Sequence, residues 1–224
     1  MTTCRLANIS LLPLLVLSAT GPAAAQRVRP PAATPVPRAV QSRSLAPPAK
    51  GEIIWTDDRH GHFIDTRDNK EYLVVRIGTQ TIMARNLAYK PTGGTFSVFE
   101  DKPKNLAKYG YLYDWETAKR IAPTGWHLPT KEEWELMIKT LGGVDTVFFT
   151  ATKEGGSSGF NALMGGFSID LGGAVISGAN APFWSATALG EDKAWYFNCQ
   201  AITKNAYMYK DLRKLGFSVR LFQD

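Results

Sequence analysis

The sequence predicts a single α+β domain over residues 51–224. Helical patterns occur in the first half of this span, whereas strand-like runs and long loops fill the second half, which is typical of α+β folds. The span also carries 19 of the 20 glycines, which indicates short strands joined by many turns. With 44% hydrophobic and 21% charged residues, the 224-residue chain has ordinary globular composition, which excludes a disordered, collagen-like or multi-span membrane protein.

Antiparallel strands are predicted in residues 62–87. Two turns interrupt this segment, at 67–70 and 78–79, where Asp, Asn and Gly favour reversal of the chain. Residues 72–77 are rich in Tyr, Val and Ile and have strong strand composition, and residues 80–84 continue the pattern. The segment therefore predicts a β-hairpin followed by a third strand.

Two helices are predicted after this sheet. The first covers 113–121, where apolar residues fall near helical spacing. The second covers 130–141, where Thr130 and Glu133 form a capping box and Trp134 begins an apolar face with i, i+3, i+4, i+7 spacing.

The second half of the domain is expected to hold short strands. Residues 155–180 are rich in Gly and Ser and predict long ordered loops around one short strand. Four strand-like runs follow, at 183–186, 194–199, 206–210 and 217–222.

Residues 1–25 have the pattern of a secretory signal peptide. Arg5 precedes an apolar run, Ile9–Ala19, that is too short to span a bilayer, and Ala23–Ala25 matches a cleavage site. The alternatives are a membrane anchor or chance hydrophobicity. A signal predicts export to the periplasm, the cell surface or the extracellular space, with no transmembrane segment after cleavage.

Residues 26–50 are expected to form an extended Pro-rich basic linker. They contain six prolines and five cations but no acidic residue, so they cannot bury a core. The simpler interpretation is a solvated tether; the alternative is that its cations also contact an anionic envelope surface.

The charge distribution argues against nucleic-acid binding. The formal net charge is +6, but six of the 26 basic residues precede residue 51, which leaves 20 basic and 20 acidic residues in 51–224. A neutral domain lacks the electrostatic basis for binding phosphate backbones.

The most specific motif is GWHLPTKEEWELM at residues 125–137. Five further segments accompany it in order: DTRDNKEYLVVRIGTQTIMARNLAY at 65–89, YGYLYDWETA at 109–118, FWSATA at 183–188, AWYF at 194–197 and GFSVR at 216–220. Together they resemble the Fibrobacter succinogenes major paralogous domain family across nearly all of 51–224. The HLPT..EW and GF..R elements also resemble the formylglycine-generating-enzyme-like branch of the C-type-lectin-like fold.

This resemblance implies a C-type-lectin-like single domain with two helices, a small twisted antiparallel sheet and long loops. The family consists largely of exported proteins of undefined activity. The residues that match its structural motif are Trp126, His127, Leu128, Pro129, Thr130, Glu133, Trp134, Trp184, Gly216, Phe217 and Arg220.

The sequence departs from the family at two cysteine positions, where it has Ala122 and Leu221. In the family these positions would form a disulfide, so we expect the two residues to lie close together and pack against each other. Cys199 would be the only cysteine after signal cleavage. A formylglycine-generating enzyme needs a cysteine pair, so the resemblance does not extend to that activity.

Aromatic residues near the C-terminus are the best binding candidates. Tyr and Trp combine apolar area with a polar tip, which suits contact with a sugar or a protein. The alternative is that most of them build the core. The candidate ligand-binding residues are Trp195, Asn198, Tyr207, Tyr209 and Lys210.

No catalytic, metal or cofactor site is predicted. His60 and His62 lack a third histidine nearby for a metal site, and His127 has no identifiable nucleophile beside it. Glu133 is explained by helix capping rather than by glycosidase chemistry. Cys199 is expected to be a buried thiol, with a reactive one as the alternative.

The sequence thus favours an exported, non-catalytic binding module that recognises a glycan or an envelope protein. The first alternative is a structural or adhesive component of the cell envelope, in which the aromatic residues are all core. The second is a formylglycine-generating-enzyme-like enzyme, which the missing cysteine pair disfavours.

Overall fold

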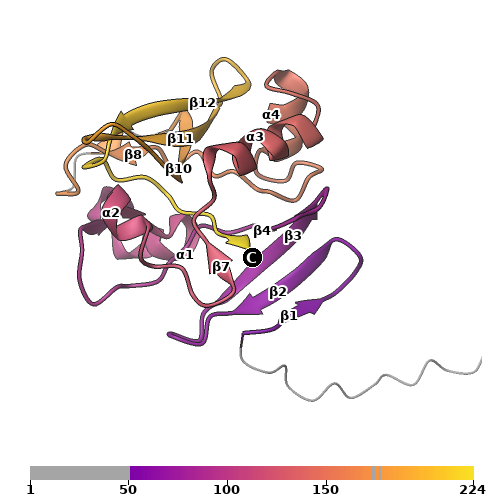
Figure 1. The fold of residues 1–224 in the computed structure, drawn as a ribbon, viewed down its shortest axis with the longest axis horizontal. Coiled ribbons are helices and arrows are strands. Elements are labelled where there is room, and N and C mark those ends of the chain that lie inside the picture. The colour runs from indigo at the N-terminus through magenta and orange to yellow at the C-terminus, as the bar shows by residue number, and fades with distance from the viewer. Residues whose placement is uncertain (1–50, 173–174, 177) are drawn as a thin grey trace, which may run out of the picture. The chain divides into compact units, whose positions relative to one another are not determined.

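The computed structural model describes residues 51–172, 175–176 and 178–224 (Figure 1). The expected signal peptide and linker lie outside the described residues. The described chain forms a mixed α+β fold with antiparallel sheets, as the sequence predicts. None of its helices is long and apolar enough to cross a bilayer.

The larger sheet has six strands in the order β1-β2-β3-β4-β13-β7. Their bounds are β1 Ile53–Trp55, β2 His60–Ile64, β3 Glu71–Ile77, β4 Gln80–Met83, β13 Phe222–Gln223 and β7 Trp126–His127. The predicted hairpin and third strand are confirmed, with His62 opposite Leu73 and Val75 opposite Ile82. β13, near the end of the chain, lies between β4 and β7 (Figure 1).

The second sheet has three long strands in the order β10-β11-β12. They are β10 Asn180–Leu189, β11 Lys193–Gln200 and β12 Asn205–Leu212, each longer than the sequence indicates. Helices lie over one face of this sheet (Figure 1): α3 Lys131–Thr140 packs against all three strands, and α4 Thr146–Thr152 contacts β12.

The second predicted helix is confirmed as α3, with both hydrogen bonds of its capping box present. The Thr130 hydroxyl accepts from the Glu133 amide at 3.2 Å, and a Glu133 carboxylate oxygen accepts from the Thr130 amide at 2.7 Å. Trp134 is fully buried beneath this helix and stacks on Phe197, with 4.7 Å between ring centroids.

The prediction of a helix over 113–121 is mostly wrong. Only α2 Trp115–Ala118 is helical, because Tyr113 pairs with Phe96 in the two-stranded sheet of β5 Phe96–Val98 and β6 Tyr111–Tyr113. Asp114 caps α2 by accepting from the Thr117 amide. Short helical turns also occur between these strands, at η1 Phe99–Asp101, η2 Pro103–Asn105 and α1 Leu106–Tyr109.

The predicted strand over 217–222 is also mostly wrong. Residues 217–221 form a buried segment with isolated bridges, Tyr113 to Phe217 and Phe183 to Ser218, and only β13 is a regular strand. The segment passes between several elements, so it makes no continuous ladder with any one of them. In the glycine-rich region, two short strands occur instead of one, β8 Phe167–Ser168 and β9 Val175–Ile176.

Arg220 connects the segments around residues 83–86 and 160–161 through hydrogen bonds inside the core. Its side chain is fully buried and donates to the backbone oxygens of Met83, Phe160 and Asn161 at 2.8–3.0 Å and to the Asn86 side chain at 2.6 Å. All four acceptors are uncharged, so the guanidinium is satisfied by hydrogen bonds and not by an ion pair in the described part of the chain. Burial lowers its pKa to about 9.

Candidate functional site

The five candidate binding residues lie on opposite faces of the β10-β11-β12 sheet. Trp195 faces Lys210 across the β11–β12 ladder, while Asn198 faces Tyr207 and Tyr196 faces Tyr209. Because side chains alternate along a strand, Trp195 and Lys210 share one face, and Asn198, Tyr207 and Tyr209 share the other. The five residues lie on β11 and β12, as the sequence predicts. They divide between the two faces of the sheet and therefore do not form one site.

Trp195 lies on the helix-covered face, and its indole is partly buried. Lys131 and Lys210 place their ammonium groups 5.1 and 6.0 Å from its ring centroids. The same face carries Phe197 and Cys199, which are fully buried against the helices. Trp195 thus lies at the border of the hydrophobic core, where one part of its ring is buried and two lysine ammonium groups lie near the ring.

The opposite face holds a pocket of about 170 Å³. Three strands supply most of its wall, and Phe167 of β8 and Phe217 complete the lining. The strand residues that line it are Asn180, Pro182, Tyr196, Asn198, Gln200, Tyr207 and Asp211.

A network of amides fixes the base of this pocket. Asn198 Nδ2 donates to Asn180 Oδ1 at 3.1 Å and to the Tyr207 hydroxyl at 3.0 Å. Gln200 Nε2 donates to the same Asn180 oxygen at 3.3 Å. Asn198 Nδ2 therefore uses both of its hydrogens within the network.

The oxygen of the same amide is left without a partner. Asn198 is only 3% exposed, and its Oδ1 makes no hydrogen bond within the described residues. Rotating the amide by 180° would exchange oxygen and nitrogen, so either orientation leaves one polar atom unsatisfied. Such a buried group costs about 1–3 kcal/mol as long as it has no partner.

Aromatic rings form the rest of the face. Tyr209 lies edge-on to both Tyr196 and Tyr207, with 6.1 Å between ring centroids in each case. Burial, together with nearby Tyr207 and Asp211, raises the pKa of Tyr196, so its hydroxyl stays protonated. Tyr209 is 54% exposed, so its ring forms an exposed aromatic surface on this face of the sheet.

Sequence reasoning missed Asn180 and Gln200, which complete the network. They occupy one face with Asn198 only because β10 and β11 pair in the register Asn180 to Gln200 and Pro182 to Asn198. Asn180 lies before the strand that the sequence predicts, so no pattern in the sequence connects it to Asn198. The alternation of Tyr207 and Tyr209 was the one signal that pointed to this face.

The motif residue His127 bridges two carboxylates. Its Nδ1 lies 2.7 Å from Asp224 Oδ1 and its Nε2 lies 2.8 Å from Glu133 Oε1. Burial lowers the pKa of His127, but the two hydrogen bonds outweigh this effect and raise it above the usual value. The contacts explain His127 as a link between β7, α3 and the C-terminal residue.

Cys199 is a buried thiol, as expected. It is fully buried on β11 beside the Thr152 hydroxyl, at 3.6 Å, and burial raises its pKa to about 12. A thiol with this pKa is not ionised near neutral pH and is a poor nucleophile.

The histidines near the N-terminal strands do not gather into a metal centre. His60 pairs with Asp57 at 3.0 Å, while Asp65 pairs with Arg67 at 2.6 Å. Over the described ranges, no group of three or more His, Cys, Asp or Glu side chains is arranged to hold a metal ion.

These features define a small α+β domain whose core is built around the WHLPT and GFSVR segments. The chain belongs to the Fibrobacter succinogenes major domain family, whose model matches residues 75–223. No curated protein and no solved structure gives a significant match to the chain.

Proposed function

We propose that this protein is an exported, non-catalytic binding module that recognises a glycan through the pocket on β10-β11-β12. The observation that carries the proposal is the buried, unpartnered amide oxygen of Asn198 at a pocket lined by tyrosines and amides. A small shift of the Asn198 side chain would expose that oxygen to a sugar hydroxyl, and the Tyr207 hydroxyl, which accepts from Asn198, can donate its own proton to the sugar.

The size and composition of the pocket support a sugar as the ligand. Its volume of about 170 Å³ is below the roughly 300–1,000 Å³ that drug-sized ligands occupy, so it would hold one sugar unit of a longer chain. The exposed ring of Tyr209 would offer apolar area for the next unit.

The fold and location belong to the same proposal. A C-type-lectin-like fold is supported by the small antiparallel sheets and by the loop-rich segment 153–172. Export is supported by the signal-peptide pattern of residues 1–25, and the basic Pro-rich linker would tether the domain near an anionic envelope surface. The buried, non-nucleophilic Cys199 supports a non-catalytic role.

A glycan array probed with the purified protein tests this function. We expect binding to at least one glycan, weakened about tenfold or more by Asn198→Ala and by Tyr207→Phe, since each removes a hydrogen-bonding group of the pocket. Trp195→Ala, on the opposite face, is the matched control and should bind like the unmodified protein.

Two outcomes would contradict the proposal. If Trp195→Ala loses binding and the other two variants do not, the glycan binds on the helix-covered face and not in this pocket. The absence of binding to any glycan would favour an envelope protein as the ligand, or a structural and adhesive role.

A further inference from the structure

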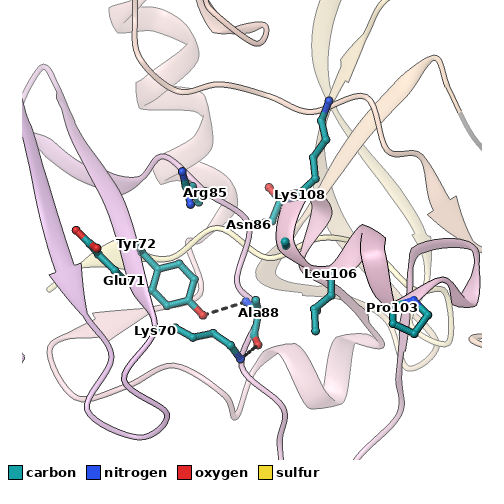
Figure 2. Close-up of a pocket in the computed structure, with 10 residues that line it drawn as sticks. Lys70, Glu71, Tyr72, Arg85, Asn86, Ala88, Pro103, Leu106 and Lys108 are labelled. Carbon is teal, nitrogen blue, oxygen red and sulfur yellow. Dashed lines mark hydrogen bonds between the residues drawn. The ribbon is translucent and has the colours of Figure 1, made fainter.

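A second and larger hollow lies on another part of the domain. Two cavities of about 430 and 360 Å³ share Arg85, Ala107 and Lys108 and therefore adjoin, and we refer to the two together as the groove. Figure 2 shows the larger cavity, with Tyr72 on β3 on one side and Leu106 and Lys108 of α1 on the other. Its volume is in the range of small-molecule sites.

The walls of this groove are largely apolar and held in place. The Tyr72 hydroxyl accepts from the Ala88 amide at 3.0 Å, and Lys70 Nζ donates to the Ala88 oxygen (Figure 2). The remaining apolar lining consists of Leu73, Ala84, Pro103, Leu106, Ala107 and Leu163. Apart from the buried Tyr72, no aromatic ring lines these two cavities, so the groove is poorly suited to sugar stacking.

The charged residues of the groove have partners, with one exception. Lys70 pairs with Asp68 at 2.8 Å, and Lys108 pairs with Glu154 at 3.4 Å. Glu71, the other lining carboxylate, pairs with His62. Arg85 lines both cavities and makes no side-chain hydrogen bond or ion pair with any residue of the described chain.

A second positive charge, on Arg220, lies close enough to repel Arg85, and no counter-ion pairs with it among the described residues. Arg220 is buried, and it donates to the side chain of Asn86, which lines the groove. Desolvation is the main reason for the lowered pKa of Arg220, and repulsion by Arg85 adds to it. Arg85 therefore offers a positive charge to an anion that enters the groove.

We propose that this groove binds a small aliphatic carboxylate, with its carboxylate on Arg85 and its hydrocarbon chain on the wall formed by Leu106 and Ala107. Arg presents a planar fork of donors that matches a carboxylate. The aliphatic lining would bury the hydrocarbon, which supplies most of the binding free energy. The site is separate from the proposed glycan pocket.

Calorimetric titration of the purified protein with octanoate tests the proposal, with 1-octanol and acetate as probes that lack the charge or the chain. We expect saturable octanoate binding and much weaker binding of both other probes. Arg85→Gln should weaken octanoate binding about tenfold or more, because it removes the lining cation that has no partner among the described residues. Lys139→Gln, which alters an exposed cation on α3 that lines neither cavity, is the matched control and should change affinity less than about threefold.

The thermal transition of Arg85→Gln should match that of the unmodified protein, since Arg85 is exposed and unpartnered in the described structure. Equal affinity of octanoate and 1-octanol, equal affinity of Arg85→Gln and unmodified protein, or no saturable octanoate binding would each overturn the proposal. Glycan binding should be unaffected by octanoate, so failure at either site can be distinguished from failure at the other.

Discussion

His127 shows how one motif residue can make stability depend on pH. Its ring lies between Asp224 and Glu133, and its pKa is raised in the folded state. A group with a raised pKa contributes stability that is fully present below its unfolded pKa, about 6.5, and that is lost as pH rises through the folded pKa. The charged imidazole therefore stabilises the fold in mildly acidic solution.

We expect His127→Gln to lower the free energy of unfolding more at pH 5.5 than at pH 8.5. Urea denaturation of both proteins at the two pH values measures this difference. A destabilisation that is equal at both pH values, or larger at pH 8.5, would show that the charge on His127 does not stabilise the fold.

Arg220 illustrates what a sequence pattern conveys at the scale of one residue. The GFSVR segment identified Arg220 as a motif residue, but nothing in the sequence indicated a buried cation held by backbone oxygens. Its acceptors come from positions 83, 86, 160 and 161, and only the folded chain brings these together.

The helix α3 is the element that the sequence predicted best. Its boundaries follow from local chemistry, because the capping box at Thr130 and the apolar face at Trp134 depend on residues within one or two turns. The helix α4 was missed for the opposite reason. Six of its seven residues, TVFFTAT, are β-branched or aromatic and favour strands, yet Asp145 caps a helix there and Phe148 is fully buried in the core.

We expect Thr130→Ala to reduce the free energy of unfolding by about 1 kcal/mol, because it removes the side-chain acceptor of the Glu133 amide. Denaturant unfolding followed by circular dichroism measures this effect. Thr140→Ala is a matched control at the other end of α3. Its exposed hydroxyl only bonds back to the Leu136 oxygen, so the change should be close to neutral, and an equal loss in both variants would argue against a specific cap.

At the scale of the whole molecule, Ala122 and Leu221 stand where the family resemblance implies a cysteine pair. Leu221 is fully buried in one of the two core clusters, and Ala122 packs against the same cluster. Their direct contact stays a prediction. If they are adjacent, the family's disulfide could be restored without rearranging the core.

The double variant Ala122→Cys, Leu221→Cys is expected to form a disulfide under mild oxidation. It would close a loop of about 100 residues, worth up to about 4.7 kcal/mol in the chain-entropy model. Mass spectrometry after thiol alkylation detects the bond, and the thermal transitions of the oxidised and reduced forms of the same variant measure its effect. Two thiols that remain fully alkylated after oxidation would show that the side chains do not meet.

The candidate site could be predicted only in part. The sequence identified Asn198, Tyr207 and Tyr209 as candidates because strand alternation is a local property. It also grouped them with Trp195 and Lys210, which the structure places on the other face. The contact of Asn180 with Asn198 depends on the register of the sheet, and the groove at Arg85 depends on packing between distant segments. A local sequence pattern predicts neither of them.

The position of β13 restricts when this domain can fold. Residues 222–223 lie inside the six-stranded sheet, between β4 and β7, so a nascent chain still attached to the ribosome cannot close that sheet until these residues have emerged. The pairing joins residues about 140 positions apart, Ile82 and Phe222, and such distant contacts slow folding. The six-stranded sheet would thus reach its native pairing only after residues 222–223 have left the ribosome, because no shorter N-terminal part of the domain contains the strand that joins β4 to β7.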